Sequence, residues 1–298
     1  MALLTQRFTT PLGRACTFGF PDPVVGCLVG LSRFSLTFGS TDHMIKEIHL
    51  STQVAQDGKA VTVTVNASMQ DTSGHQIDLA ESTATITVLA WTNEMPVTLA
   101  VGGVTGLVNG SRGPSSGIAT PGGSVISQAV LSGFHLDYGD KHDVLSVNAQ
   151  ASTSINGSLG YVNAAAGMQD ASGHSAPNPT IDGTLLLASV QAPGLVVGTL
   201  QTQTRNPANV TLSVPSGYIL ADAAVMLSGF TVQYPGTGDH WIKTIGAGAL
   251  GCSISGANVV TLSDARAFMS DNSGHRQDDA NSNVSLVVIG ILRKPEQE

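Results

Sequence analysis

Met69-Gln-Asp-Thr-Ser-Gly-His75 is a stretch that occurs twice more in nearly the same form, from Met168 to His174 and from Met269 to His275. The copies begin about 100 residues apart, a longer period than the roughly 20–50 residues of a solenoid repeat. Each copy should therefore mark one unit of domain size. The spacing predicts a chain built by internal triplication.

A second motif keeps the same order in each unit. Leu31-Ser-Arg-Phe-Ser-Leu-Thr-Phe38 returns as Leu131-Ser-Gly-Phe-His-Leu-Asp-Tyr138 and as Leu227-Ser-Gly-Phe-Thr-Val-Gln-Tyr234. Apolar and polar side chains alternate in these stretches, which is typical of a strand with one buried face. We expect their aromatic residues to lie in the core.

Alternation of this kind continues through the rest of the first unit. Val61, Val63 and Val65 alternate with threonines, and Thr, Val and Ile suit a pleated, half-buried surface. Asp57-Gly58 lies between two such runs and is a hairpin signal. We expect four or more antiparallel strands per unit, which in the first unit span 24–38, 44–55, 59–70 and 83–92.

The predicted fold class is all-β, with three tandem antiparallel β-sandwich-like domains that could pack on one another as a covalent pseudo-trimer. Residues 102–123 are rich in Gly, Ser and Pro and should form a loop or linker, whereas 193–215 alternates more and could add a strand. The predicted division is an N-terminal arm (1–20), sandwich repeats (21–93, 124–192 and 214–293), connectors (94–123 and 193–213) and a C-terminal tail (294–298).

Composition excludes several classes of protein. The chain has 298 residues, 42% of them hydrophobic and only 11% charged, with a formal net charge of −8. Scattered Lys and Arg argue against a nucleic-acid partner, because neutralising phosphates requires clustered cations. No apolar run is long enough to span a bilayer and no secretory signal is visible, so we expect no membrane insertion and leave the compartment open. Three cysteines without CxxC spacing predict neither a disulfide framework nor a zinc knuckle.

Histidines recur at two positions of each unit. One ends the Asp-x-Ser-Gly-His motif, in which the Asp should accept backbone N–H bonds and the Gly should take a left-handed conformation. The other follows the Phe-x-Leu-x-aromatic strand. The candidate ligand- or partner-binding residues are Asp42, His43, Asp71, His75, His142, Asp170, His174, Asp239, His240, Trp241, Asp271 and His275.

Three interpretations of these histidines stay open. Each could be a neutral clasp bonded to an Asp or a carbonyl, a contact for a polar ligand or partner, or part of a divalent metal site. The second unit has Lys141 where the others have Asp before His, so a metal-ligand set is not repeated cleanly. The clasp is preferred, and no metal or other cofactor is predicted. Trp241, directly after His240, is the best candidate for an exposed stacking or interface residue.

No catalytic residue is predicted. Gly113-Pro-Ser-Ser-Gly117 matches the G-x-S-x-G string, but a nucleophile elbow needs a strand-to-helix turn and no helix is expected here. Triplication also places like residues in three locations, whereas an enzyme gathers unlike residues in one cleft.

The sequence therefore predicts a non-enzymatic structural or assembly protein, for example a capsid or tail component of a phage-like or viral particle. Such a protein would act in the virion or in an extracellular assembly, through self-association or contact with other particle subunits. The alternative is a multivalent carbohydrate-binding protein with one glycan site per repeat, because three equivalent sites on one rigid body gain avidity.

Overall fold

The structure, a computed structural model, describes residues 2–190, 194–236, 238–274, 276–277 and 281–295. These residues form antiparallel strands in four sheets and no helix, which confirms the predicted all-β class. None of them belongs to a helix long and apolar enough to cross a membrane.

Three of the sheets have six strands each. The first has the order β1 (Ala2–Pro11), β6 (Thr83–Thr92), β3 (Val24–Thr37), β16 (Thr244–Gly248), β19 (Arg266–Ser270) and β20 (Arg276–Gln277). The second has the order β2 (Ala15–Gly19), β5 (Ala60–Gln70), β4 (Ile45–Asp57), β9 (Val125–His142), β12 (Thr180–Ser189) and β7 (Leu99–Val108). The third has the order β13 (Leu195–Thr202), β21 (Asn283–Arg293), β15 (Ile219–Gln233), β10 (Ser146–Asn156), β11 (Leu159–Gln169) and β8 (Arg112–Ala119). A small fourth sheet has the order β14 (Ala208–Thr211), β18 (Val259–Ser263) and β17 (Gly251–Ile254).

The strands predicted for the first unit are confirmed within a few residues. The observed β3, β4, β5 and β6 correspond to the expected spans 24–38, 44–55, 59–70 and 83–92. Alternation locates these strands because each must bury one face, whichever strand it pairs with.

Each six-stranded sheet joins strands from two of the predicted repeats, here called repeat 1 (21–93), repeat 2 (124–192) and repeat 3 (214–293). The junctions pair β3 with β16, β9 with β4, and β15 with β10. The structure thus differs from three separate tandem sandwiches, because no repeat completes a six-stranded sheet from its own strands. The physical reason is that the long strands β3, β9 and β15 would otherwise leave a row of unpaired N–H and C=O groups at a sheet edge.

The predicted linker at 102–123 is a second difference, because it lies largely in strands β7 and β8. The two strands pack closely there: a Cβ on Gly102 would lie 2.3 Å from Cδ1 of Ile118 in β8, so the Ile118 side chain would have to move. The segment 1–20 likewise holds β1 and β2, and 193–213 holds β13 and β14. The expectation that 193–215 adds a strand is therefore confirmed.

An aromatic triangle joins the three repeats in the main core. The rings of Phe34, Phe134 and Phe230 lie 5.3–5.4 Å apart between centroids, and all three side chains are buried. Phe38, Tyr138 and Tyr234 are buried farther along the same motif, as expected. A smaller core around Trp91 also draws on all three repeats. The repeats thus share their interior as well as their sheets.

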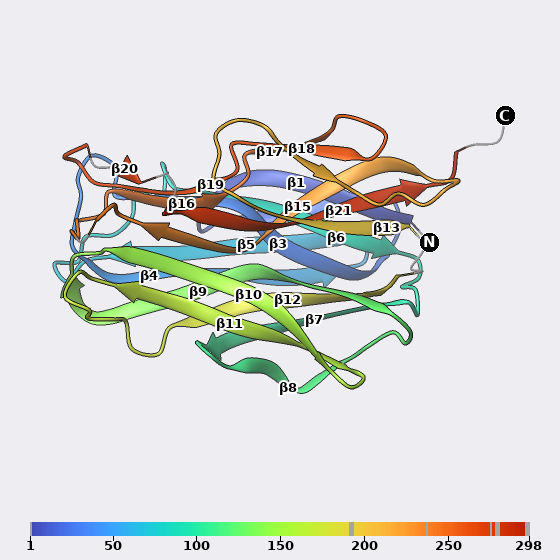
Figure 1. The fold of residues 1–298 in the computed structure, drawn as a ribbon, viewed down its shortest axis with the longest axis horizontal. Coiled ribbons are helices and arrows are strands. Elements are labelled where there is room, and N and C mark those ends of the chain that lie inside the picture. The colour runs from blue at the N-terminus through green and yellow to red at the C-terminus, as the bar shows by residue number, and fades with distance from the viewer. Residues whose placement is uncertain (1, 191–193, 237, 275, 278–280, 296–298) are drawn as a thin grey trace.

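The strands run along the long axis of the molecule (Figure 1). The loops after β3 and β5, together with β20, lie at one end of this axis, and the start of β1 and the end of β21 lie at the other (Figure 1). The first of these ends carries the recurring histidines.

Candidate functional site at the histidine loops

The segments that carry the first histidine of each repeat are joined in a closed ring. Three antiparallel bridges form it: His43 with Ile242, His142 with Ile45, and His240 with Val144. The backbone bonds are well formed, with His43 N 3.0 Å from Ile242 O and Val144 N 2.9 Å from His240 O. Each of these histidines therefore lies at a junction between two repeats.

The side chain of each of these histidines contacts the aspartate of its own repeat's Asp-x-Ser-Gly-His motif. Nδ1 lies 3.0 Å from Oδ2 in the His43–Asp71 and His142–Asp170 pairs, and 3.3 Å in the third pair, His240–Asp271. The aspartate side chains are 4–11% exposed, and the histidine side chains are 16–28% exposed. The structure thus brings together, within each repeat, two candidates that are separated by about thirty residues.

The aspartate also organises its own turn. Oδ1 of Asp71 accepts hydrogen bonds from the backbone N–H groups of Ser73 (2.8 Å) and His75 (3.0 Å), and Asp170 repeats this pattern. Gly74 has φ +92°, in the left-handed region that the turn requires. Burial raises the pKa of Asp71, but bonds from Ser73, His75 and His43 outweigh it, so the pKa lies below its ordinary value. The pKa of Asp170 is lowered in the same way.

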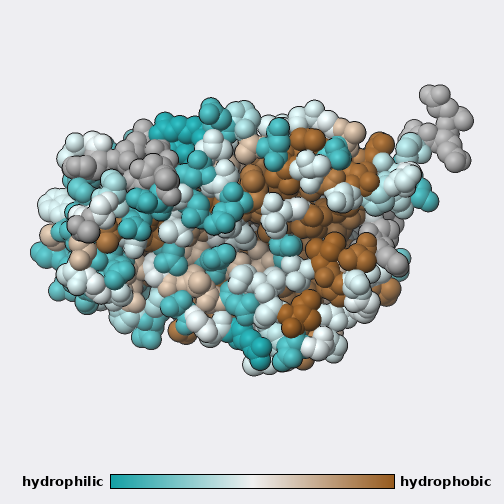
Figure 2. Space-filling model, viewed as in Figure 1, coloured by the Kyte–Doolittle hydropathy of each residue, from teal (hydrophilic) through white to brown (hydrophobic). Residues whose placement is uncertain are grey.

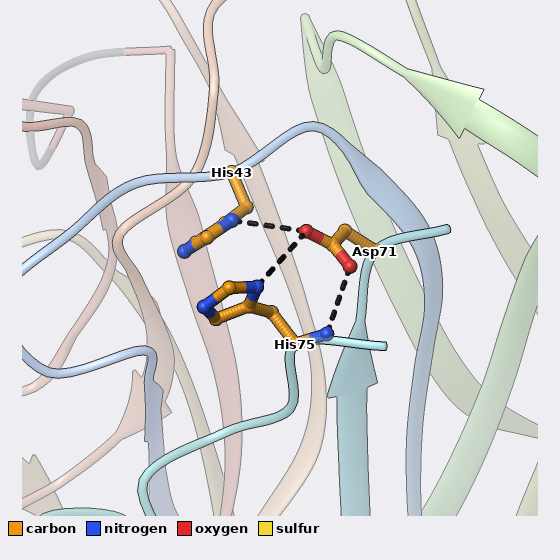
Figure 3. Close-up of side chains that lie close together, drawn as sticks. All are labelled: His43, Asp71 and His75. Atoms are coloured by element: carbon orange, nitrogen blue, oxygen red, sulfur yellow. Dashed lines mark hydrogen bonds and ion pairs between the residues drawn. The ribbon is translucent and has the colours of Figure 1, made fainter. Parts of the chain in front are cut away.

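The first histidine of each repeat packs against the aromatic ring that ends the Phe-x-Leu/Val-x-aromatic motif of the same repeat. The centroid distances are 4.6 Å for Phe38–His43, 4.9 Å for Tyr138–His142 and 4.6 Å for Tyr234–His240. His43 also stacks on His75 at 4.5 Å, and His142 stacks on His174 at 4.0 Å. Figure 3 shows His43 and His75 facing each other beside Asp71. His275, the corresponding residue of repeat 3, lies outside the described residues.

Two more candidate aspartates bind a neighbouring repeat. Oδ2 of Asp239 accepts a hydrogen bond from the backbone N–H of Ala171 at 3.1 Å, and Oδ2 of Asp42 accepts one from Asn272 at 2.9 Å. Each bond stabilises the motif turn of another repeat. At the third junction Lys141 occupies the corresponding position, so the ring is not chemically uniform.

Trp241 and Asp143 meet at the junction of repeats 2 and 3. The Trp241 side chain is 46% exposed, and its indole hydrogen-bonds to Asp143. Burial and the charge of Asp239 raise the pKa of Asp143, although this bond opposes the shift. Sequence reasoning did not select Asp143, whose only signal is its place directly after a recurring histidine.

The motif has the residue types of a hydrolase triad but not the geometry. Oγ of Ser73 lies 3.2 Å from Nδ1 of His75, and Oδ2 of Asp71 lies 3.9 Å from that same nitrogen. A triad needs the nucleophile and the acid at opposite ring nitrogens. Ser73 instead donates its hydroxyl proton to Asp71.

No model of a known protein family matches this chain, and no curated protein matches it either. What the molecule does must therefore be argued from its own geometry.

Proposed function

We propose that this protein is a non-enzymatic structural subunit of a larger particle, of the phage-like or viral kind, built from one triplicated β module. The support is the exchange of strands between repeats, which gives one chain the interlocked architecture of a trimer. Cores shared by three repeats and a closed ring of bridges suit a rigid body whose role is contact. In this proposal the histidine–aspartate pairs are clasps that hold the ring.

An apolar groove on the outer surface carries the proposal. It has a volume of about 490 Å³, and its apolar lining includes Ile126, Val190, Val196, Val197 and Leu292. Figure 2 shows apolar residues gathered over β13 and its neighbours. A grouped apolar surface of this kind marks sites of protein contact.

The groove follows an open sheet edge. Among the described residues, β13 is the outermost strand of its sheet and pairs with β21 alone, so its other side can accept a strand from a neighbouring subunit. Apolar contact and strand pairing at one place would together join the subunits of a particle.

Light scattering coupled to size exclusion tests this proposal. We expect concentration-dependent self-association at micromolar protein, and we expect Val190→Asp to abolish it because Val190 is 58% exposed at the groove. Leu79→Asp is the matched control, because Leu79 is similarly exposed but lies in the loop between β5 and β6, at the histidine end. A strict monomer, or equal loss in both variants, would count against an assembly role.

A second candidate function is multivalent glycan binding, which the exposed rings at the histidine end favour. The His75 side chain is 65% exposed and stacks on His43 at an interplanar angle of 29°, and the Trp241 side chain is exposed at another junction. Exposed flat rings can stack against a sugar. A glycan array should then show binding that Trp241→Ala weakens, and an array without signal would remove this candidate.

A further inference from the structure

The histidine end of repeat 1 has the geometry of a metal site. His43, Asp71 and His75 each offer one ligand atom, and these atoms all lie within 4.8 Å of one another. Nδ1 of His43 is 3.0 Å and Nδ1 of His75 is 3.9 Å from the same atom, Oδ2 of Asp71, as Figure 3 shows. We propose that these three residues bind one divalent transition-metal ion of the Zn²⁺ type.

The residue types and distances suit such an ion. Imidazole nitrogen and carboxylate oxygen bind Zn²⁺ at about 2.0–2.2 Å, so ligand atoms around one ion lie roughly 3–4 Å apart. Two histidines and one carboxylate leave further positions open to solvent. The ion would bind the Nδ1 lone pair of His43 in place of the hydrogen bond between His43 Nδ1 and Asp71 Oδ2, and the one proton of the neutral ring would then be on Nε2, where it can be donated to Thr41 Oγ1.

Hydrogen bonds behind the ligands already hold two of them in place. Nε2 of His43 lies 2.9 Å from Oγ1 of Thr41, which fixes the ring and directs Nδ1 toward Asp71. The backbone N–H groups of Ser73 and His75 bind Oδ1 of Asp71, which leaves Oδ2 facing the imidazoles. Outer hydrogen bonds of this kind are typical of metal sites because they fix ligand orientation.

The exposed side chain of His75 gives the ion access to the site from solvent. His43 and Asp71 side chains are 16% and 11% exposed, whereas His75 is 65% exposed. An ion can therefore reach the site from solvent, and the His75 ring can move the few tenths of an ångström that binding requires without disturbing the core.

Repeat 2 has the same residue types in a different geometry. The rings of His142 and His174 are nearly parallel, with an interplanar angle of 12° at 4.0 Å, whereas His43 and His75 are inclined by 29°. The nitrogen lone pairs of two parallel stacked rings lie in two separate parallel planes, so they cannot both point at one ion. The proposal therefore assigns the site to repeat 1 and makes repeat 2 its internal control.

Metal titration of the full chain, stripped with chelator, tests the assignment. Zn²⁺ binding is measured by calorimetry, and Co²⁺ binding by its visible d–d absorption. We expect His75→Gln to remove about one equivalent per chain relative to the unsubstituted protein, and His174→Gln to remove none. Thr41→Val should weaken affinity by about tenfold or more without changing stoichiometry, because it deletes only the hydroxyl behind His43.

Two results would overturn the proposal. One is an unsubstituted protein that binds neither ion above the buffer background. The other is equal binding by His75→Gln and the unsubstituted protein, which would place any bound metal elsewhere. Neither result depends on whether the protein assembles, because the number of ions bound is counted per chain in the monomer and in the assembly alike.

Discussion

His142 contacts the carboxylate of Asp170 in its own repeat, with Nδ1 3.0 Å from Oδ2, while its backbone pairs with Ile45 of repeat 1. One residue thus joins a turn within a repeat to the junction between two repeats. Because the Asp170 side chain is only 7% exposed, its carboxylate depends on bonds from protein groups in place of water. The contact therefore contributes to both the local turn and the ring.

Removal of this imidazole should destabilise the protein. His142→Ala leaves Oδ2 of Asp170 buried without its partner, and such a loss costs about 1–3 kcal/mol. Guanidinium unfolding followed by circular dichroism would measure the change in midpoint. Lys141→Ala is the control because that neighbouring side chain is exposed, and it should shift stability by less than about 0.5 kcal/mol. Equal midpoints for the two variants would contradict the clasp.

Lowering the pH should weaken the contact between His142 and Asp170. The pKa of Asp170 is lowered in the folded protein from its ordinary value of 3.8, so the unfolded chain binds its proton first as the pH falls. The stabilisation is therefore fully present above about pH 4 and is lost as the pH falls through the folded pKa. Thermal melts of the unsubstituted protein and of Asp170→Asn should differ at pH 6 and converge as the pH falls below about 4.

Other titrating groups do not reverse this comparison. Tyr138 and Asp143 lie near the same carboxylate, and both proteins carry them. The raised pKa of Asp143 acts in the opposite sense, since protonation of a buried, unfavourably charged group stabilises the fold as the pH falls. A difference between the melts that grew on acidification would refute the assignment to Asp170.

The strands and the clustering of the site residues could be predicted because both follow local rules. Alternation located β3 to β6, and recurrence at two positions singled out the histidines that contact Asp71 and Asp170. The turn formed by Asp, Ser and Gly could also be predicted from the sequence, because its hydrogen bonds join only residues within one loop.

The exchange of strands could not be predicted from the same signals. Alternation tells which face of β10 is buried, but it does not tell that one edge pairs with β11 and the other with β15. The roles of Asp42 and Asp239 depend on this exchange, because each binds a turn of another repeat. The glycine-rich strand β7 was missed because glycine for close packing and glycine for a loop look alike in sequence.

The junction between β9 and β4 should be highly sensitive to a single methyl group. A Cβ on Gly133 would lie 2.5 Å from the backbone oxygen of Leu50, across the boundary between repeats 2 and 1. Gly133→Ala should therefore destabilise the protein by about 1–3 kcal/mol or more, because backbone atoms cannot yield as a flexible side chain can. Gly19→Ala is the matched control in a strand, since a Cβ there meets nothing within 4 Å. Similar unfolding midpoints for the two variants would contradict the close approach of β9 to β4.

The shared aromatic triangle should make the three repeats unfold together. Phe134 is 1% exposed and contacts Phe34 and Phe230, one from each other repeat, so Phe134→Ala should cost about 3–5 kcal/mol. Because each six-stranded sheet also spans two repeats, this loss should lower one common transition in calorimetry, with no separate melting of repeat 2. Phe8→Ala removes a ring that is 52% exposed and should change stability far less. A calorimetric trace in which Phe134→Ala lowers one of several resolved transitions would show that the repeats fold independently, contrary to the strand exchange.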